Sequence, residues 1–217
     1  MFLRLLLNGY FVAGSLSIIM VALFAEKRMR LALSGHGNSF RGARRFSVSK
    51  NWFALFYMIG IAASVGVLPF ARIVDWLFLI HLTRRLLETV IWPYSFDSRM
   101  NLLHLAVGLT YYPMLTLAIF RAKFQAPSIL AFWLPLWAIQ SLSHYRLAEY
   151  KEHHGNHCAD MKVLRWPFQL SDMPHYWCEV IMYWVLAVSA SLESALVFNA
   201  LFVSCNLAIS AWTKKSK

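Results

Sequence analysis

Long apolar segments recur along the whole chain and constrain its fold more than any other feature. A helix needs about 20 mostly apolar residues to cross the hydrocarbon of a bilayer. The chain is 59% hydrophobic and only 14% charged, against roughly a quarter charged in soluble domains. We therefore predict an all-α integral membrane protein, a single transmembrane domain over residues 1–217 with about seven helices in one bundle. The predicted helices cover residues 3–24, 52–70, 75–96, 101–120, 127–147, 177–192 and 194–213, and Glu193 marks a tight turn between the last two.

The distribution of lysine and arginine predicts the orientation of these helices. Of the 21 basic residues, fourteen lie in the loops and tail of one side, four on the other side and three within helices. Because basic loops favour the cytosolic side, the amino terminus is predicted to be lumenal or external. The net charge of +11 follows from this asymmetry and from anionic head groups, so we expect no nucleic-acid partner. The Gly- and Arg-rich loop 34–50 fits phosphate capture or contact with anionic lipid, and lipid is favoured.

The segment 76–92 is apolar enough to enter a bilayer, yet its centre is polar. At about 100° per residue, His81, Arg84, Arg85 and Glu88 fall on one narrow face. Arg84 and Glu88 stand at i, i+4 and can pair. Ionisable residues inside a membrane segment are costly and usually mark function. We predict a polar site buried in the bundle; the alternative is an ion-paired helix end whose side chains reach the head groups.

A second dense stretch covers residues 174–184. Pro174 fits the first turn of a helix, and Ser171 or Asp172 can cap it. This helix start would lie at the cytosolic boundary, where a helix amino terminus favours phosphate oxygens. The alternative, an interfacial aromatic belt, explains the Tyr and Trp residues but not Glu179. The face at successive i, i+4 steps consists of His175, Glu179 and Tyr183.

Histidines gather in and just before the long cytosolic connection 148–176, which invites a metal interpretation. The cluster offers a single HHxxH box, without the second box of membrane di-iron enzymes or a full set of zinc ligands. We predict a solvated loop cluster and no metal. P-loop, GxGxxG and GxSxG motifs are absent from the sequence. The residues concerned are His144, His153, His154, His157 and Cys158.

A series of motifs follows in one order between residue 48 and about residue 210. They are Val48–Tyr57 (similar to VxKxWFxxFY), Leu79–Glu88 (similar to LHxLRRLxE), Tyr94–Phe96, Gly108–Tyr112, His144–Arg146 and Pro174–Tyr183. Together they resemble the steroid 5α-reductase family, specifically its polyprenol (polyprenal) reductase branch. The resemblance implies a multi-pass endoplasmic-reticulum enzyme that uses NADPH to reduce a C=C bond conjugated to a carbonyl. The implied substrate is a long-chain isoprenoid, polyprenal, on the route to dolichol for protein N-glycosylation, with the active site towards the cytosol.

The resemblance also implies site residues. Phe56 and Leu82 stand where steroid-reducing members hold the substrate carbonyl with a Glu and a Tyr, so a 3-oxo steroid is not expected. Tyr57 and His81 are the nearest replacement donors, and with Glu88 they form the predicted catalytic set. The predicted cofactor contacts are Arg85, His144, Tyr145, Arg165, His175, Tyr176, Glu179 and Asn206.

Two departures from the family pattern leave alternatives open. The loop between Pro167 and Pro174 is short, and the sequence stops at Lys217, where the family continues through further NADPH contacts. One alternative is an isoprenyl-cysteine methyltransferase-like membrane enzyme. The other is a C-terminally truncated, inactive paralogue that acts as a membrane partner.

Overall fold

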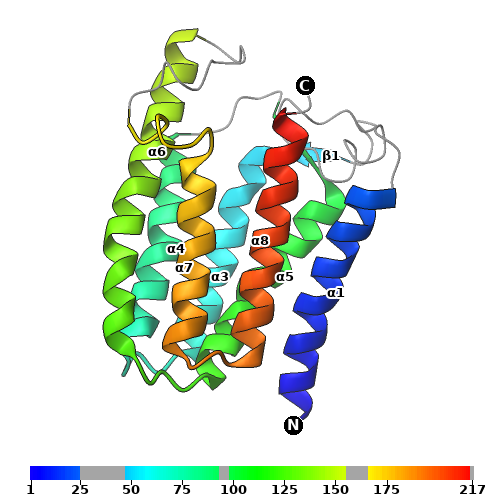
Figure 1. Cartoon of the computed structure of the whole chain (residues 1–217), viewed down its shortest axis with the longest axis vertical. Helices are drawn as coiled ribbons and strands as arrows, with labels where there is room; N and C mark the ends of the chain where they lie inside the picture. The colour runs from blue at the N-terminus through cyan, green and yellow to red at the C-terminus, as the bar shows by residue number, and fades with distance from the viewer. Residues whose placement is uncertain (25–46, 93–97, 155–165, 216–217) are drawn as a thin grey trace.

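The computed structural model describes residues 1–24, 47–92, 98–154 and 166–215. Seven α-helices of these residues run side by side in one bundle (Figure 1). They are α1 (Phe2–Phe24), α3 (Phe53–Val67), α4 (Ile73–Ile91), α5 (Leu102–Arg121), α6 (Trp133–His154), α7 (Pro174–Ser189) and α8 (Ser194–Lys215). Short 3-10 helices, η2 (Lys50–Trp52) and η3 (Pro127–Phe132), precede α3 and α6. Most of the loop 34–50, the motif Tyr94–Phe96 and Arg165 lie outside the described residues.

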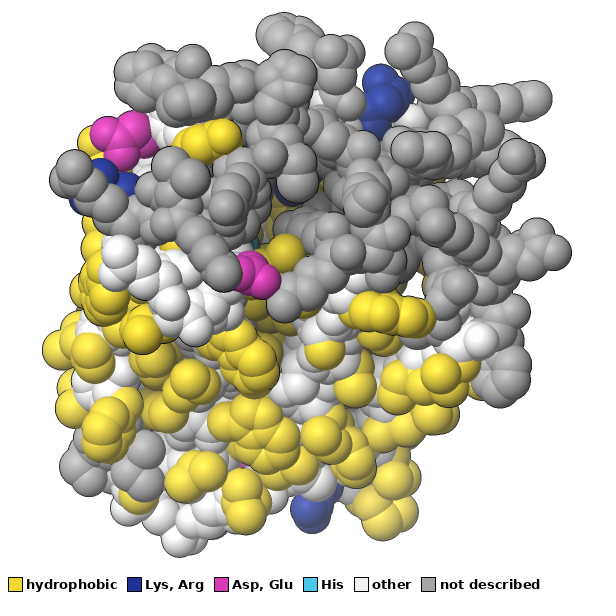
Figure 2. Space-filling model, turned by 45° about the horizontal axis from the view of Figure 1, so that its top comes forward, with side chains coloured by type: hydrophobic (Ala, Val, Ile, Leu, Met, Phe, Trp, Pro, Cys, Tyr) yellow, Lys and Arg dark blue, Asp and Glu magenta, His cyan; other side chains and the backbone are white. Residues whose placement is uncertain are grey.

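The outer surface of the bundle suits lipid. Hydrophobic side chains cover much of the described face in Figure 2, whereas soluble monomers rarely expose apolar patches beyond a few hundred Å². Four helical stretches of the described residues are long and apolar enough to cross a membrane. The prediction of an all-α membrane protein is confirmed, while the count of seven crossings stays a prediction. The four stretches are Phe2–Val21, Lys50–Val67, Leu102–Arg121 and Ser194–Trp212.

Prolines end two helices earlier than the hydropathy pattern predicted. Helix α3 stops at Val67 rather than at residue 70, because Leu68 precedes Pro69 and takes an extended conformation. Helix α4 stops at Ile91 rather than at residue 96, because Trp92 precedes Pro93. In both cases the proline ring disfavours the α conformation of the residue before it.

The bounds of α6 and α7 also correct the sequence prediction. Residues 127–132 form a 3-10 turn, so the α-helix begins only at Trp133, and it continues to His154. Its last turns contain good helix formers such as Glu and Lys, and nothing there breaks the helix before Gly155. Helix α7 begins at Pro174, before the apolar span predicted from residue 177, which confirms the prediction that this proline stands in the first turn. The tight turn predicted at Glu193 is confirmed; Ser191 and Leu192 have φ values of 53° and 58°.

A short antiparallel strand pair, which the sequence did not predict, ties the start of α3 to the start of α5. Strand β1 (Ser47–Ser49) pairs with β2 (Arg99–Asn101), with Val48 opposite Met100. The Arg99 guanidinium donates to Ser47 Oγ at 2.7 Å. Asn101 then caps α5 by accepting the Leu103 N–H at 2.8 Å. These contacts fix two neighbouring helices at the same end of the bundle.

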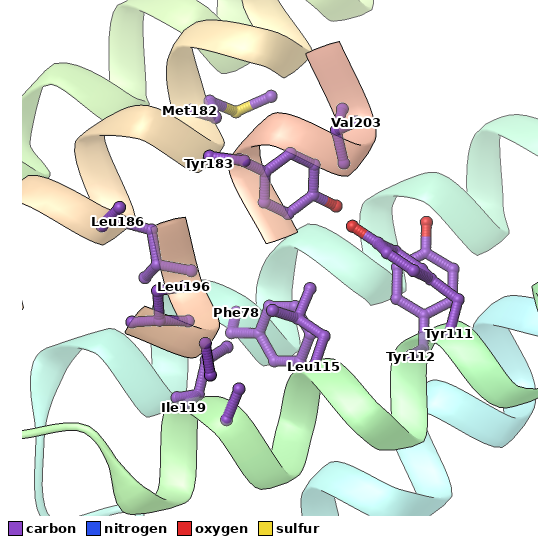
Figure 3. Close-up of a cluster of buried hydrophobic side chains, with 14 of the residues drawn as sticks. Phe78, Tyr111, Tyr112, Leu115, Ile119, Met182, Tyr183, Leu186, Leu196 and Val203 are labelled. Carbon is purple, nitrogen blue, oxygen red and sulfur yellow. The ribbon is translucent and has the colours of Figure 1, made fainter. Parts of the chain in front are cut away.

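Helices α3, α4 and α5 pack closely because small residues face large ones. A Cβ on Gly108 of α5 would lie 2.3 Å from the Phe56 ring, and one on Gly60 would lie 2.8 Å from Tyr112 Cβ. The apolar core continues between α4, α5, α7 and α8 (Figure 3). Its fully buried members include Phe78, Leu115, Ile119, Met182, Leu186 and Leu196.

The two described ends of the chain lie at opposite ends of the bundle (Figure 1). Helix α1 packs along α8, and Arg4 Nε donates to Ser194 Oγ at 3.1 Å. The turn between α7 and α8 therefore shares an end with the start of α1. The end of α4, the start of α7 and the strand pair lie at the opposite end of the bundle. The polar residues of α4, α6 and α7 meet towards that end.

Candidate functional site

The Glu88 carboxylate organises a polar network inside the bundle. Arg84 Nη1 donates to one carboxylate oxygen at 2.6 Å, and Arg85 Nη1 donates to the other at 2.5 Å. From α6, Ser141 Oγ donates to the first oxygen at 2.8 Å, and His144 Nδ1 lies 2.7 Å from the second. The side chains of Glu88, Arg84 and Arg85 are 9%, 17% and 13% exposed. The polar residues of α4 thus lie inside the bundle and the predicted Arg84–Glu88 pair is confirmed, while their role as a functional site stays a prediction.

The His144 ring meets a cation and an anion at the same nitrogen. Its Nδ1 lies 2.7 Å from both Glu88 Oε2 and Arg85 Nη1. A guanidinium only donates and a carboxylate only accepts, so Nδ1 can donate to Glu88 or accept from Arg85 but not both. The tautomer of His144 therefore decides whether Nδ1 forms a hydrogen bond with Glu88 or with Arg85.

Gln140 connects this network to α7. Its side-chain oxygen accepts from Arg84 Nη2, and its Nε2 lies within hydrogen-bond distance of Glu179 Oε2, at 3.3 Å, and of the His175 carbonyl, at 3.4 Å. The side chain is fully buried, and a buried amide must be satisfied at both ends. Gln140 thus links the arginine of α4 to the carboxylate of α7.

His81 lies on the same polar face of α4, one turn before Arg84 and Arg85, and is 3% exposed. The Trp137 indole N–H donates to His81 Nδ1 at 3.1 Å, and an indole nitrogen can only donate. Nδ1 is therefore unprotonated, and the neutral ring carries its proton on Nε2. This buried Nε2 has no hydrogen-bond partner among the described residues. The Nε2–H of His81 is therefore a buried hydrogen-bond donor, and the contact with Trp137 fixes the orientation of its ring.

The start of α7 adds the next group of side chains. The His175 ring lies 5.3 Å from that of His144 and 4.5 Å from that of Tyr176, between ring centroids. The predicted caps are wrong, because the N-cap residue is Met173 and no side chain caps the helix. Ser171 Oγ instead accepts the Met173 N–H at 3.2 Å, one residue before the helix.

A row of tyrosines leads from the charged network into the apolar core. The Arg85 guanidinium carbon lies 5.5 Å from the centre of the Tyr57 ring, a cation–π distance. Tyr57 contacts Tyr112 with ring centroids 5.4 Å apart, and Tyr112 contacts Tyr111 at 5.0 Å. Tyr111 contacts Tyr183 of α7 at 6.4 Å, and Figure 3 shows these last two rings converging. All four rings are buried.

The structure therefore brings most of the predicted site residues together, and the contacts described above do not include the others. Tyr145 is 43% exposed and packs on Trp92 at the outer surface. Asn206 is half-buried on α8, and Arg165 lies outside the described residues. Within the described chain, no three His, Cys, Asp or Glu side chains could hold a metal ion. The residues that form one connected group are Tyr57, Arg85, Glu88, His144, His175, Tyr176 and, through Gln140, Glu179.

Sequence reasoning named His144 of α6 but missed the other polar residues on the same face of that helix. Trp137, Gln140, Ser141 and His144 are spaced three or four residues apart and so share one face of that helix. Polar side chains on one face of a membrane helix, which are rare and usually face a protein interior, were the signal that could have identified Gln140 and Ser141. The same spacing would have placed His144 beside them.

No protein-family model matches the chain. Among curated proteins, it is similar to the polyprenal reductase of Saccharomyces cerevisiae. The two are 29% identical over 187 residues, which cover 80% of this chain and 68% of the yeast protein. The resemblance to the polyprenal reductase branch is thereby confirmed.

Proposed function

We propose that this protein reduces the α,β C=C bond of a long-chain isoprenoid aldehyde, with NADPH as the hydride donor. The observation that carries the proposal is the buried network of two arginines, a glutamate and a histidine in a membrane bundle. Its supports are the order of motifs in the sequence and the similarity to the yeast polyprenal reductase. We extend the proposal to the endoplasmic-reticulum membrane and to dolichol formation, with the network towards the cytosol.

The donors of the network fit the phosphates of a nucleotide cofactor. Buried guanidinium groups bind phosphate oxygens through paired, charge-assisted hydrogen bonds. The Arg84 Nε–H is buried without a hydrogen-bond partner among the described residues, so a donor remains available beside the ion pairs. The start of α7 lies beside this group, and a helix amino terminus also favours phosphate. The residues proposed to hold NADPH are Arg85, His144, His175, Tyr176 and Glu179, with Tyr145, Arg165 and Asn206 as proposed outer contacts.

When bound, NADPH supplies the hydride that reaches the β carbon of the unsaturated aldehyde. The electron pair of the C=C bond moves towards the carbonyl oxygen, which then needs hydrogen-bond donors, and the α carbon takes up a proton. In a site without bulk water, fixed donors stabilise such an oxygen strongly. Tyr57 and the Nε2–H of His81 are the donors proposed from the sequence.

The geometry favours a positioning role for Glu88 within the proposed catalytic set. Its two carboxylate oxygens contact four nitrogen or oxygen atoms from four side chains. A carboxylate offers about four acceptor positions, so these contacts leave it little capacity to bind a substrate group. We propose that Glu88 holds the arginines and His144 in place while other groups contact the cofactor.

The test is NADPH oxidation by the purified protein with polyprenal, with chromatographic detection of the saturated product. Arg85→Lys keeps the charge but loses the two-pronged geometry, so we expect the apparent NADPH affinity to fall about 10- to 100-fold, as for the loss of one charge-assisted bond. Glu179→Gln should also raise the NADPH requirement at unchanged protein abundance. Arg146→Lys, in the partly exposed pair with Glu149, is the matched control and should behave like the parent.

A purely structural role for Arg85 makes the opposite prediction. Lysine should then serve nearly as well, and the double variant Arg85→Met with Glu88→Gln should restore activity, because it removes both buried charges together. Unchanged NADPH affinity in Arg85→Lys and Glu179→Gln would remove both residues from the site. Absence of any NADPH oxidation in the parent would refute the proposed reaction.

A further inference from the structure

We infer that the hydroxyl groups of Tyr111 and Tyr183 hold the oxygen atom of the isoprenoid, a neutral aldehyde or alcohol oxygen. The inference rests on the proposed function and names the subsite that receives the polar end of the substrate. Tyr111 belongs to α5 and Tyr183 to α7. Sequence reasoning noted Tyr183 only as part of a helix face and assigned no role to either hydroxyl.

The two hydroxyls converge on one another in the buried interior. Figure 3 shows their oxygen atoms pointing towards one another, from rings whose centroids are 6.4 Å apart at an interplanar angle of 85°. The residues are 8% and 2% exposed. Both hydroxyl oxygens are buried, and neither has a partner with hydrogen-bond geometry in the part of the chain that the structure describes.

Packing explains the rings but not the hydroxyls. Tyr111 stacks on Phe202 of α8 at 5.6 Å and meets Phe11 of α1 edge-on at 6.3 Å. Phenylalanine would make the same ring contacts. A buried hydroxyl without a partner lowers stability, so a pair of them in one place points to a ligand that completes their hydrogen bonds.

The surroundings specify a neutral ligand with an apolar body. Figure 3 shows Leu115, Met182, Leu186 and Val203 around the two tyrosines, and Glu179 stands one helical turn before Tyr183 on α7. A carbonyl or alcohol oxygen has two lone pairs and can accept from both hydroxyls at once. The apolar side chains suit an isoprenoid chain, whereas a phosphate or carboxylate would be buried beside the side chain of Glu179, which is itself acidic.

A second buried polar group without a hydrogen-bond partner among the described residues lies on α8. Asn199 is fully buried, and neither its amide nitrogen nor its amide oxygen has a partner among the described residues. It stands one turn before Val203, whose side chain lies beside Tyr183 in Figure 3. Residues four apart share a helix face, so the amide belongs to the same side of α8 as the tyrosine pair.

This subsite differs from the one that the sequence favoured. Tyr57 lies beneath Arg85 at one end of the tyrosine row, whereas Tyr111 and Tyr183 lie at the other end, where α5 meets α7. We therefore assign the oxygen of the isoprenoid to the Tyr111–Tyr183 pair and leave Tyr57 beside the cofactor. A test must separate these two assignments.

The experiment compares two ligands and four proteins in the same detergent. The ligands are geranylgeraniol, an alcohol that cannot undergo the proposed reduction without prior oxidation, and the hydrocarbon in which hydrogen replaces its hydroxyl. Quenching of tryptophan fluorescence gives the dissociation constants. The proteins are the parent, the double variant Tyr111→Phe/Tyr183→Phe, Tyr57→Phe and the control Tyr10→Phe. The Tyr10 hydroxyl already lies 2.9 Å from Thr110 Oγ1, outside the pair.

We expect the parent to bind the alcohol about 10-fold more tightly than the hydrocarbon, as two hydrogen bonds to one oxygen allow. The double variant should bind both ligands equally, while Tyr10→Phe keeps the preference of the parent. The ligand-free double variant should unfold at the same temperature as the parent or higher, because it no longer buries two unsatisfied hydroxyls.

Three results would overturn the inference: equal binding of the two ligands by the parent, an unchanged preference in the double variant, or loss of the preference in Tyr57→Phe alone. A lower unfolding temperature of the ligand-free double variant would also overturn it, because it would show that the hydroxyls stabilise the fold through each other or through bound water. The proposed reaction is tested separately by NADPH oxidation with polyprenal, so either idea can fail while the other stands.

Discussion

At the scale of single residues, Glu88 carries the most interactions in the polar network. It joins two arginines of α4 to Ser141 and His144 of α6. Breaking a buried ion pair by removing one partner leaves an uncompensated charge in a medium of low polarity, which costs about 3–5 kcal/mol. The stability of the bundle should therefore depend on this carboxylate more than on any surface pair.

Replacing Glu88 by Gln should destabilise the protein by about 3–5 kcal/mol, because both arginines lose their counter-charge. Glu149→Gln is the matched control, since Glu149 pairs with Arg146 at 3.1 Å but is 39% exposed. Its loss should cost under about 1 kcal/mol. Thermal unfolding of the two variants in one detergent measures the difference. Equal midpoints would mean that solvent or lipid head groups already screen the network.

Two apolar residues bear on the choice of substrate. Phe56 and Leu82 are 4% and 0% exposed, and neither can donate to a carbonyl oxygen. A ketone buried beside them loses roughly 1–3 kcal/mol for each missing partner. We therefore expect turnover of polyprenal and none of a 3-oxo-4-ene steroid, assayed side by side at equal protein concentration. Efficient steroid reduction without isoprenoid reduction would contradict the assignment to the polyprenal branch.

At the scale of helices, the spacing of α3 and α5 depends on two glycines that admit large side chains. The ring of Phe56 occupies the position that a Cβ on Gly108 would need. Gly66, near the end of α3, has nothing within 4 Å of such a Cβ. Replacing glycine by alanine therefore adds a methyl group to a crowded position at Gly108 and to an open position at Gly66.

Gly108→Ala should destabilise the bundle by about 1–3 kcal/mol, because the added methyl group must displace a buried ring. Gly66→Ala should be neutral or stabilising by up to about 1 kcal/mol, since alanine is the better helix former and meets no neighbour. Urea or thermal unfolding of both variants tests the pair. If both substitutions had the same effect, close packing between α3 and α5 would not control stability.

At the scale of the whole molecule, the charge asymmetry of the loops and the arrangement of the helices agree. The seven described helices place the two ends of the described chain at opposite ends of the bundle, as an odd number of crossings requires. The polar network lies towards the end where α4 finishes and α7 begins. If that end faces the cytosol, soluble NADPH can reach it directly.

A glycosylation acceptor fused before residue 1 should therefore be modified in the endoplasmic reticulum, and one fused after residue 217 should not. The physical reason is the excess of basic loop residues, fourteen against four, on the side predicted to stay in the cytosol. Gel mobility before and after glycosidase treatment provides the measurement. The reverse pattern would place the network on the lumenal side, away from cytosolic NADPH.

The sequence alone determined the class of the fold and the centre of its buried polar network. Hydropathy located all seven described helices, because a segment that enters lipid must be apolar over a fixed length and must satisfy its own backbone. Helical periodicity placed Arg84, Arg85 and Glu88 together, because residues three and four apart share a face. These results depend only on local spacing, which a sequence contains in full.

Only the tertiary structure decided which residues of different helices meet. Gln140 reaches Arg84 and Glu179, and Trp137 sets the proton of His81, although each pair is separated by tens of residues in the chain. The convergence of Tyr111 and Tyr183 depends on how α5 and α7 are rotated about their axes, and packing against every neighbour determines that rotation. The hydropathy of a residue indicates whether it tends to be buried, but it does not indicate which residue of another helix it contacts.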